Sequence, residues 1–473
     1  MEEASSNQCN DDIAKVVQKF VHRMTNVDKS IKLFVPVAID AHKEQVISAA
    51  LSIKKFFDYA IANPEEFPSS IEEGKKQMSL SLELDQLLKE RGADLSNDEI
   101  VREHEAFSAY KEAQRIYNSN ENSDLIETLN HALFMNLYSI FDAFTGELLE
   151  TIYKVKPELY GSLEKNVPFE EILRANDLES LKTKILQSDI ESFRRSSYVE
   201  QFKTLEKRFA IRTLREFDLW QSFVSFSQKR NVLMHCDGIV SEQYISVCKE
   251  NGVNEKKIPD IGEKISLHSS QVLVASYTIC LTGCMLAYTL WNKITPKDRE
   301  TIDDQLNILC FDFLVEEKWN HSVRLGEFIH QNLKPASAVS QKMNSVNLAI
   351  GYKQLEQKKP FKKIMDSVDW SILSLDFKLA QSVLNDDYES AASIMRRIGQ
   401  KGDYVDRQAY HNWPLFKDFR KSSEFAGAYI EIFGEHYICE QINNASNDTS
   451  IDDKPKDDES KVDKNACDTG ELQ

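Results

Sequence analysis

The segment 230–235 reads Arg-Asn-Val-Leu-Met-His and combines a permanent cation with a side chain that titrates near neutral pH. This pair suits the cleavage of a phosphodiester bond in RNA. A histidine can remove the proton of a ribose 2′-hydroxyl or protonate the leaving oxygen, and an arginine can stabilise the charge that develops on the phosphate. Because the nucleophile comes from the RNA, the route needs no metal ion and gives a 2′,3′-cyclic phosphate and a 5′-hydroxyl.

The spacing of the pair sets its geometry on a helix. Residues five apart lie about 140° apart around the helix axis, so Arg230 and His235 do not share a face. Asn231 and His235, four apart, do share one. We therefore expect a polar surface of Asn231 and His235, with the long Arg230 side chain reaching round to it and a second chain completing the site. The spacing alone also fits helix caps or surface contacts.

Local charge permits an RNA ligand. The chain has a formal net charge of −18, so it is not drawn to nucleic acid or anionic membrane as a whole. Residues 201–235, however, contain seven basic and three acidic residues. The candidate RNA-binding residues are Lys229, Arg215, Arg212 and Arg208. The other interpretation is that these side chains form an ordinary solvated helix face.

The elements that position the motif are expected to be helices, because the 473 residues include only 15 glycines and 11 prolines. A weak capping box at 218–221 predicts the start of the motif helix, and Gly238 predicts its end, so that His235 falls in the last turn. A short extended excursion at 239–240 and 244–245 should follow. An apolar helix is then predicted over Ser269–Trp291.

A second, longer helix is predicted from the signature Asp124-x-x-Glu127. Its apolar residues recur every three or four positions and should form one buried stripe. They are Leu125, Leu129, Leu133, Leu137, Phe141, Phe144, Leu148 and Ile152.

The motif and its helices together resemble the HEPN domain superfamily, whose signature is an arginine, a polar residue and then a histidine late in a helix. Asn231 matches the polar residue. The long helix around Asp142 resembles the first helix of the family, which often brings an acidic residue toward the dyad, and the apolar helix after the motif resembles the closing helix. The resemblance covers about residues 121–295. It implies a bundle of four helices, a homodimer through the motif helices and, in many members, metal-independent endoribonuclease activity in toxin–antitoxin, abortive-infection or RNA-processing systems.

The flanking regions are also expected to be helical. Residues 1–120 form an N-terminal helical region, with helices predicted over Ala38–Ala62, Ile71–Glu90 and Asn97–Tyr117. Residues 296–440 contain paired helices that resemble tetratricopeptide repeats, although no strict 34-residue period is present. The alternative interpretation of this region is an unrelated helical bundle. Trp319 and Tyr388 should lie in similar places near the start of second helices. Residues 441–473, with nine acidic and four basic residues, are expected to be disordered.

The sequence predicts a cytoplasmic protein with reduced thiols, because its eight cysteines include no Cys-x-x-Cys pair and its start lacks the features of a signal peptide. No cofactor or metal is expected, because the chain contains no Walker loop, Rossmann glycine pattern or His-Glu-x-x-His motif. Cys280 and Cys284 are expected in the core. The segment 265–292 lacks charged residues and is long enough to span a bilayer, but its many polar residues favour a buried helix.

Two main hypotheses follow. In the first, the chain is a regulated RNase in a toxin or antiviral setting: His235 is the acid and base, Arg230 binds phosphate, and Asn231 and Asp142 orient the dyad. Its partners are RNA, a second copy of the chain and a protein regulator on residues 296–440. In the second, the same domain only dimerises and the chain is a non-catalytic adaptor. A third, membrane-anchored hypothesis depends on segment 265–292.

Overall fold

The computed structural model describes residues 2–62, 125–163, 167–175, 177–333, 336–370 and 374–437. Within these ranges the chain is helical, and extended pairing is limited to two isolated antiparallel bridges, which confirms the all-α prediction.

The helices of the N-terminal and central part are α1 (Glu2–Ala62), α4 (Leu125–Val155), α5 (Phe169–Arg174), α6 (Leu178–Arg195), α7 (Tyr198–Phe209), α8 (Trp220–His235), α9 (Glu242–Glu250) and α10 (Ser269–Ile294). Those of the C-terminal part are α11 (Arg299–Val315), α12 (Trp319–Asn332), α13 (Ala338–Gln354), α14 (Lys358–Asp366), α15 (Leu375–Leu384), α16 (Tyr388–Ile398), α17 (Arg407–Asn412) and α18 (Ser423–Phe433). Short 3₁₀ turns cover Pro157–Ser162, Glu255–Lys257, Pro414–Phe416 and Phe419–Lys421.

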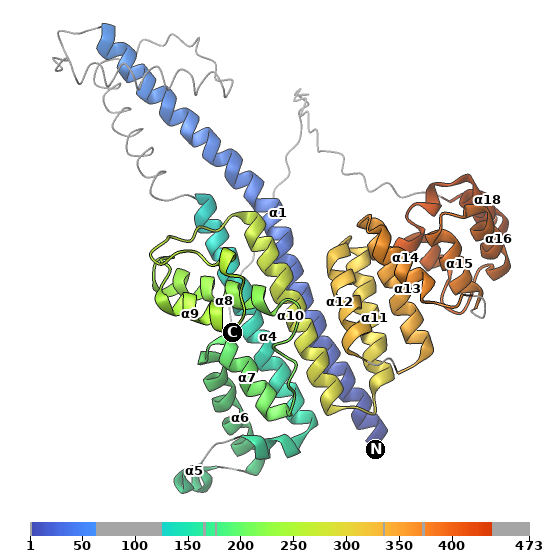
Figure 1. Ribbon diagram of the computed structural model, residues 1–473, viewed down its shortest axis with the longest axis horizontal. Helices are drawn as coiled ribbons and strands as arrows, with labels where there is room; N and C mark the ends of the chain where they lie inside the picture. The colour runs from blue at the N-terminus through green and yellow to red at the C-terminus, as the bar shows by residue number, and fades with distance from the viewer. Residues whose placement is uncertain are drawn as a thin grey trace, which may run out of the picture.

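Helices α1, α4 and α10 run side by side and form the centre of the larger hydrophobic core (Figure 1). Phe20 of α1 stacks on Phe144 of α4 with ring centroids 4.0 Å apart. The ring also lies against Gly283 of α10, where an added Cβ would meet it at 2.5 Å. The absence of a side chain at position 283 therefore lets α1 approach α10 closely.

The predicted start of a helix at Ala38 is wrong, because α1 is continuous through Pro36. Apolar residues from Ile13 to Val35 are buried against the bundle. Their burial outweighs the ~3 kcal/mol that a proline costs inside a helix. The other two helices predicted before residue 120, the Asp124 cap and the predicted disordered tail lie outside the described residues.

The predicted stripe of α4 is confirmed over most of its length. Leu137, Phe141 and Ile152 are fully buried, whereas Leu125 at the start is 47% exposed. The core that this stripe joins also contains residues of α1, α11 and α12, so its edges do not coincide with the predicted domain boundaries at 120 and 295.

Helix α10 is long and apolar enough to cross a membrane by length and composition, but 78% of its most apolar window is buried inside the molecule. Such burial is typical of a core helix in a soluble bundle. Cys280 and Cys284 lie in this core, as predicted. The hydrogen bond and burial that they share raise the pKa of the Cys284 thiol.

Three helical hairpins in the C-terminal part share one turn geometry. In each turn an acidic residue has a left-handed backbone: Glu317 between α11 and α12, Glu356 between α13 and α14, and Asp386 between α15 and α16. The next amide donates to a carbonyl five residues earlier at 2.8, 2.9 and 3.0 Å, respectively. This bond closes the helix end as in a Schellman motif. Trp319 and Tyr388 begin second helices, as predicted.

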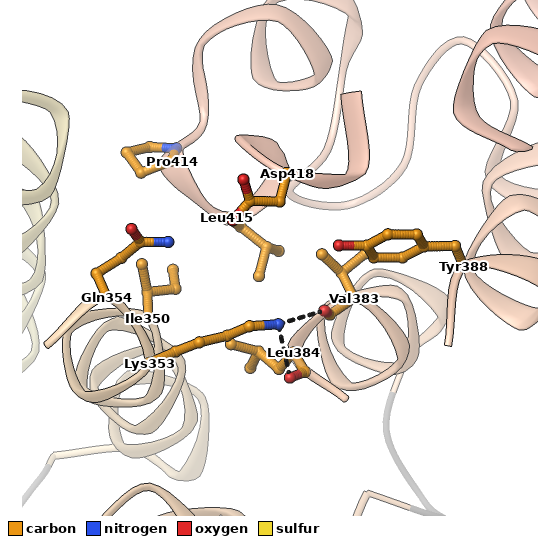
Figure 2. A pocket seen from close by; sticks show the side chains of 9 residues that line it. All are labelled: Ile350, Lys353, Gln354, Val383, Leu384, Tyr388, Pro414, Leu415 and Asp418. Atoms are coloured by element: carbon orange, nitrogen blue, oxygen red, sulfur yellow. Dashed lines mark hydrogen bonds between the residues drawn. The ribbon is translucent and has the colours of Figure 1, made fainter. Parts of the chain in front are cut away.

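The hairpins share a second core, and the half-buried amine of Lys353 links α13 to α15 (Figure 2). The Lys353 ammonium on α13 donates to the backbone carbonyls of Val383 and Leu384 at 3.2 and 3.0 Å and pairs with Asp386 at 2.6 Å. It therefore satisfies the last carbonyls of α15. The cavity beside it measures only about 10 Å³, roughly the space of one water molecule. This joint is structural and fixes α13 against α15.

Candidate functional site

All four candidate catalytic residues line one cavity of about 530 Å³. Arg230, Asn231 and His235 come from the second half of α8, and Asp142 comes from the middle of α4. The start of α7 and the end of α6 form the other wall. The structure thus brings together side chains that are about 90 positions apart in the sequence.

The end of α8 exposes the histidine. His235 is the last residue of the helix, as expected, and Gly238 adopts a positive φ of 79°. The Cys236 and Gly238 amides both donate to the Val232 carbonyl. His235 is exposed and has no hydrogen bond or ion pair within the described ranges. Its ring is therefore free to contact a ligand.

The start of α8 differs from the prediction. The residue before the helix is Leu219, whose side chain makes no capping bond. The Asp218 carboxylate instead accepts a hydrogen bond from Arg324 of α12 at 3.0 Å. The predicted capping box is wrong because this ion pair between helices takes the carboxylate away from the helix end.

Arg230 reaches round the helix toward Asn231, as its length predicted. Its guanidinium donates to the Asn231 side-chain oxygen at 3.3 Å. Both side chains are half-buried, and Arg230 forms no ion pair within 4.0 Å among the described residues. Most of its donor groups are therefore left for an anionic ligand.

Asp142 is the half-buried acid of the cavity. One carboxylate oxygen, Oδ1, is buried without a hydrogen-bond partner in the described part of the chain. Burial raises the pKa of the Asp142 carboxyl, while a hydrogen bond from Tyr198 and the charges of Arg230 and Arg194 act in the opposite direction. The acid therefore lies within electrostatic reach of both guanidinium groups.

The lining of the cavity also includes residues that the motif did not indicate, among them Arg194, Arg195, Ser196 and Ser197. Arg194 donates through Nε to the Asp142 carbonyl at 2.9 Å and through a terminal nitrogen to the Ala143 carbonyl at 3.4 Å. Its guanidinium lies over Gly146 of α4, where any Cβ would overlap it. Ser197 caps α7 by accepting from the Glu200 amide.

A signal for this arrangement is present in the sequence. A glycine inside a helix costs ~1 kcal/mol relative to alanine and often marks close packing. Gly146 lies within the long predicted helix, four residues after Asp142, and the adjacent arginines 194 and 195 precede a pair of serines. The sequence pattern alone does not predict the packing that places Arg194 over Gly146.

The four candidate RNA-binding residues do not line this cavity. Arg208 makes a two-point ion pair with buried Asp189 at 2.6 and 2.9 Å, and Arg215 binds Glu206 at 2.8 Å. Both guanidinium groups therefore hold the fold together. Arg212 is exposed between α7 and α8.

Lys229 lines a different cavity of about 450 Å³ together with Lys256, Lys257 and Lys264. Its ammonium lies 5.5 Å from the centre of the Phe226 ring, and burial lowers the pKa of the amine. Lys264 pairs with Asp237 at 3.3 Å.

The region after the motif helix is only partly extended. Ile239 forms an isolated bridge with Lys264, whereas Tyr244 and Ile245 lie in α9. The predicted extended segment at 244–245 is wrong because the Ser241 hydroxyl caps a new helix and Tyr244 is buried beneath it.

Comparison with protein-family models, with curated proteins and with solved structures finds no match to this chain. The HEPN resemblance therefore depends on the motif and the order of helices alone, and the chemistry must be argued from the cavity.

Proposed function

We propose that this protein is a metal-independent endoribonuclease of the HEPN type that acts in the cytoplasm in a toxin or antiviral setting. The observation that carries the proposal is the composition of one cavity, which contains the exposed His235 imidazole, three arginines and one half-buried carboxyl group. A cavity with this excess of positive charge suits a phosphodiester, and the histidine supplies the group that moves protons.

The proposed reaction is an internal transesterification. His235 removes the proton of a ribose 2′-hydroxyl, whose oxygen forms a bond to phosphorus while the bond to the 5′-oxygen breaks. The leaving oxygen takes up a proton, which the His235 of a second copy supplies in the dimer that the HEPN resemblance implies. Arg230 and Arg194 stabilise the charge on the phosphate oxygens. The products carry a 2′,3′-cyclic phosphate and a 5′-hydroxyl.

The experiment compares the full chain with His235→Ala and Arg230→Ala on 5′-labelled single-stranded RNA in the presence of EDTA. We expect both substitutions to lower the cleavage rate at least ~100-fold, because each removes a group used in the transition state. Enzymatic end-group analysis should identify 2′,3′-cyclic phosphate termini. The control is His330→Ala, which changes an exposed histidine of α12 outside the cavity. Equal cleavage by all four proteins would contradict the assignment.

A second candidate function is a non-catalytic adaptor that dimerises through the same domain. One observation favours it: among the described residues no side chain orients the His235 ring, whereas catalytic histidines are usually held by a second group. This alternative predicts RNA that stays intact at all protein concentrations, together with a dimer that survives both substitutions.

A further inference from the structure

A groove of about 1090 Å³ lies in the C-terminal part of the described chain. It is lined by one face of α11, one face of α13, the start of α15 and the segment 404–413 that contains α17. These are the first helices of the three hairpins, so the shared turn geometry places them along one side. The groove is separate from the cavity that contains His235.

The floor of the groove is apolar although it is open to solvent. Ile308, Val315, Val339 and Tyr404 are 46%, 49%, 39% and 44% exposed. Phe311, Met343 and Phe377 add further apolar surface. A contiguous exposed apolar surface of this kind is typical of a binding site, because soluble proteins rarely leave one uncovered.

The charges on the groove have one sign. Its lining contains five acidic residues and no lysine, arginine or histidine: Glu300, Asp304, Asp312, Asp376 and Asp406. Asp376 and Asp406 are occupied by backbone amides. Glu300, Asp304 and Asp312 instead follow one another along α11 at intervals of four and eight residues, which places them on the same face as Ile308.

The surroundings of the acidic groups disfavour their charged form, and a bound cation would stabilise it. Partial burial raises the pKa of the Asp304 carboxyl, and the neighbouring Glu300 charge raises it further. Partial burial and the Glu316 charge likewise raise the pKa of the Asp312 carboxyl. A positively charged ligand would therefore be attracted, whereas an acidic one would be repelled. The acidic C-terminal segment 441–473 of this chain does not fit that requirement.

Two polar side-chain atoms of residues that line the groove have no hydrogen-bond partner among the described residues. Asn307 is 8% exposed, and its side-chain oxygen has no hydrogen-bond partner among the described residues, although its nitrogen donates to the Ser340 carbonyl at 3.2 Å. The indole nitrogen of Trp413 likewise has no acceptor there. Both residues line the groove, but these two polar atoms are themselves buried.

We infer that this groove binds a basic segment of a partner protein that carries lysine or arginine next to aliphatic or aromatic side chains. The stripe from Glu300 to Val315 extends about 22 Å at 1.5 Å per helical residue. That length matches about seven residues of extended peptide at ~3.3 Å each. The apolar side chains occupy the floor, and the cationic ones pair with Asp304 and Asp312. The inference does not depend on RNA cleavage.

The test measures fluorescence anisotropy of the full chain with an array of labelled ten-residue peptides. Four classes are used, in which basic or acidic residues are combined with apolar or with serine-rich positions. We expect the basic and apolar class to bind, and its binding to weaken as salt rises. Binding restricted to acidic peptides, equal binding of the basic class without apolar residues, or no binding in any class would overturn the inference.

Matched variants locate the binding surface. Asp304→Asn with Asp312→Asn removes two exposed groove charges and should weaken binding about tenfold. The control, Asp366→Asn with Glu389→Asn, removes the same charge from α14 and α16 outside the groove and should leave binding unchanged. Equal losses in both proteins would overturn the inference. A self-association that only the groove variant abolishes would also do so, because a second copy would then be the occupant.

Discussion

Gly146 and Arg194 show how one position can control the candidate site without belonging to it. Replacing Gly146 with alanine would place a Cβ where the Arg194 guanidinium lies. The end of a flexible side chain can move away, so we expect Arg194 to leave the Asp142 and Ala143 carbonyls while α4 stays intact. The free energy of unfolding should rise by up to ~1 kcal/mol through helix propensity. RNA cleavage, in contrast, should fall about tenfold because the guanidinium no longer faces the cavity.

Urea unfolding and RNA cleavage measured on the same Gly146→Ala preparation check both parts of this expectation. Gly161→Ala is the control, because nothing lies within 4 Å of a Cβ added there. Unchanged cleavage in the Gly146 variant would show that Arg194 takes no part in the reaction.

A second prediction at the scale of residues concerns His321 and the pH dependence of the free energy of unfolding. Its ring packs between Tyr277 and Phe313, and burial together with the charges of Lys318 and Lys32 lowers its pKa to about 3. The unfolded chain, with a histidine pKa near 6.5, binds a proton that the folded chain does not. The contribution of His321 to stability is therefore complete above pH ~6.5 and is lost as the pH falls toward 3.

His321→Phe should remove this dependence. Between pH 7 and pH 5 the wild-type protein should lose ~2 kcal/mol more of its free energy of unfolding than the variant does. Urea unfolding of both proteins at the two pH values gives the difference directly. Parallel losses in the two proteins would mean that the ring is accessible to protons in the folded state.

At the scale of elements, the sequence predicted helices well where an apolar stripe or a terminal residue defined them. The stripe of α4, the end of α8 before Gly238 and the starts of α12 and α16 are present as expected. These features depend on residues close together in the chain. The predicted helix start at Ala38 is wrong because distant helices decide it: burial of α1 against α4 and α10 keeps the helix continuous through Pro36.

The residues of the candidate site also fall into those that local sequence patterns predict and those that only tertiary packing brings together. The motif predicted Arg230, Asn231 and His235 from local spacing, and the helix order predicted Asp142 in the same place; these four residues do line one cavity. Arg194 and Arg195 could not be found by spacing, because only packing brings α6 to α4. Basic composition alone equally could not separate Arg208, which pairs with a buried acid, from a ligand-binding arginine.

At the scale of the molecule, two hydrophobic cores are joined through α11 and α12. A buried network strengthens this junction: Lys318, at the start of α12, donates to Thr25 of α1 at 2.6 Å and pairs with Asp28 at 3.3 Å. The N-terminal helix therefore supports both the bundle that contains the candidate site and the first of the hairpins that form the groove. This continuity explains why boundaries drawn from sequence composition do not separate the cores.

The expected homodimer concerns the whole molecule, and a substitution of one side chain can test it. Met234, which precedes His235 in α8, is 53% exposed, and Ile239, just after the end of that helix, is 39% exposed. An apolar surface adjoining the motif is what an interface through α8 requires. Met234→Glu would bury an unpaired charge in that interface, so the dimer dissociation constant should rise about a hundredfold and RNA cleavage should fall with it.

Analytical ultracentrifugation over a range of protein concentrations measures this change. Val274→Glu is a matched control, because Val274 of α10 is also 53% exposed but lies outside the motif helix. If the site is shared between two copies, cleavage by the Met234 variant should recover at high protein concentration, where dimers reform. Full activity in a monomeric Met234 variant would instead show that one copy of Arg230 and His235 is sufficient.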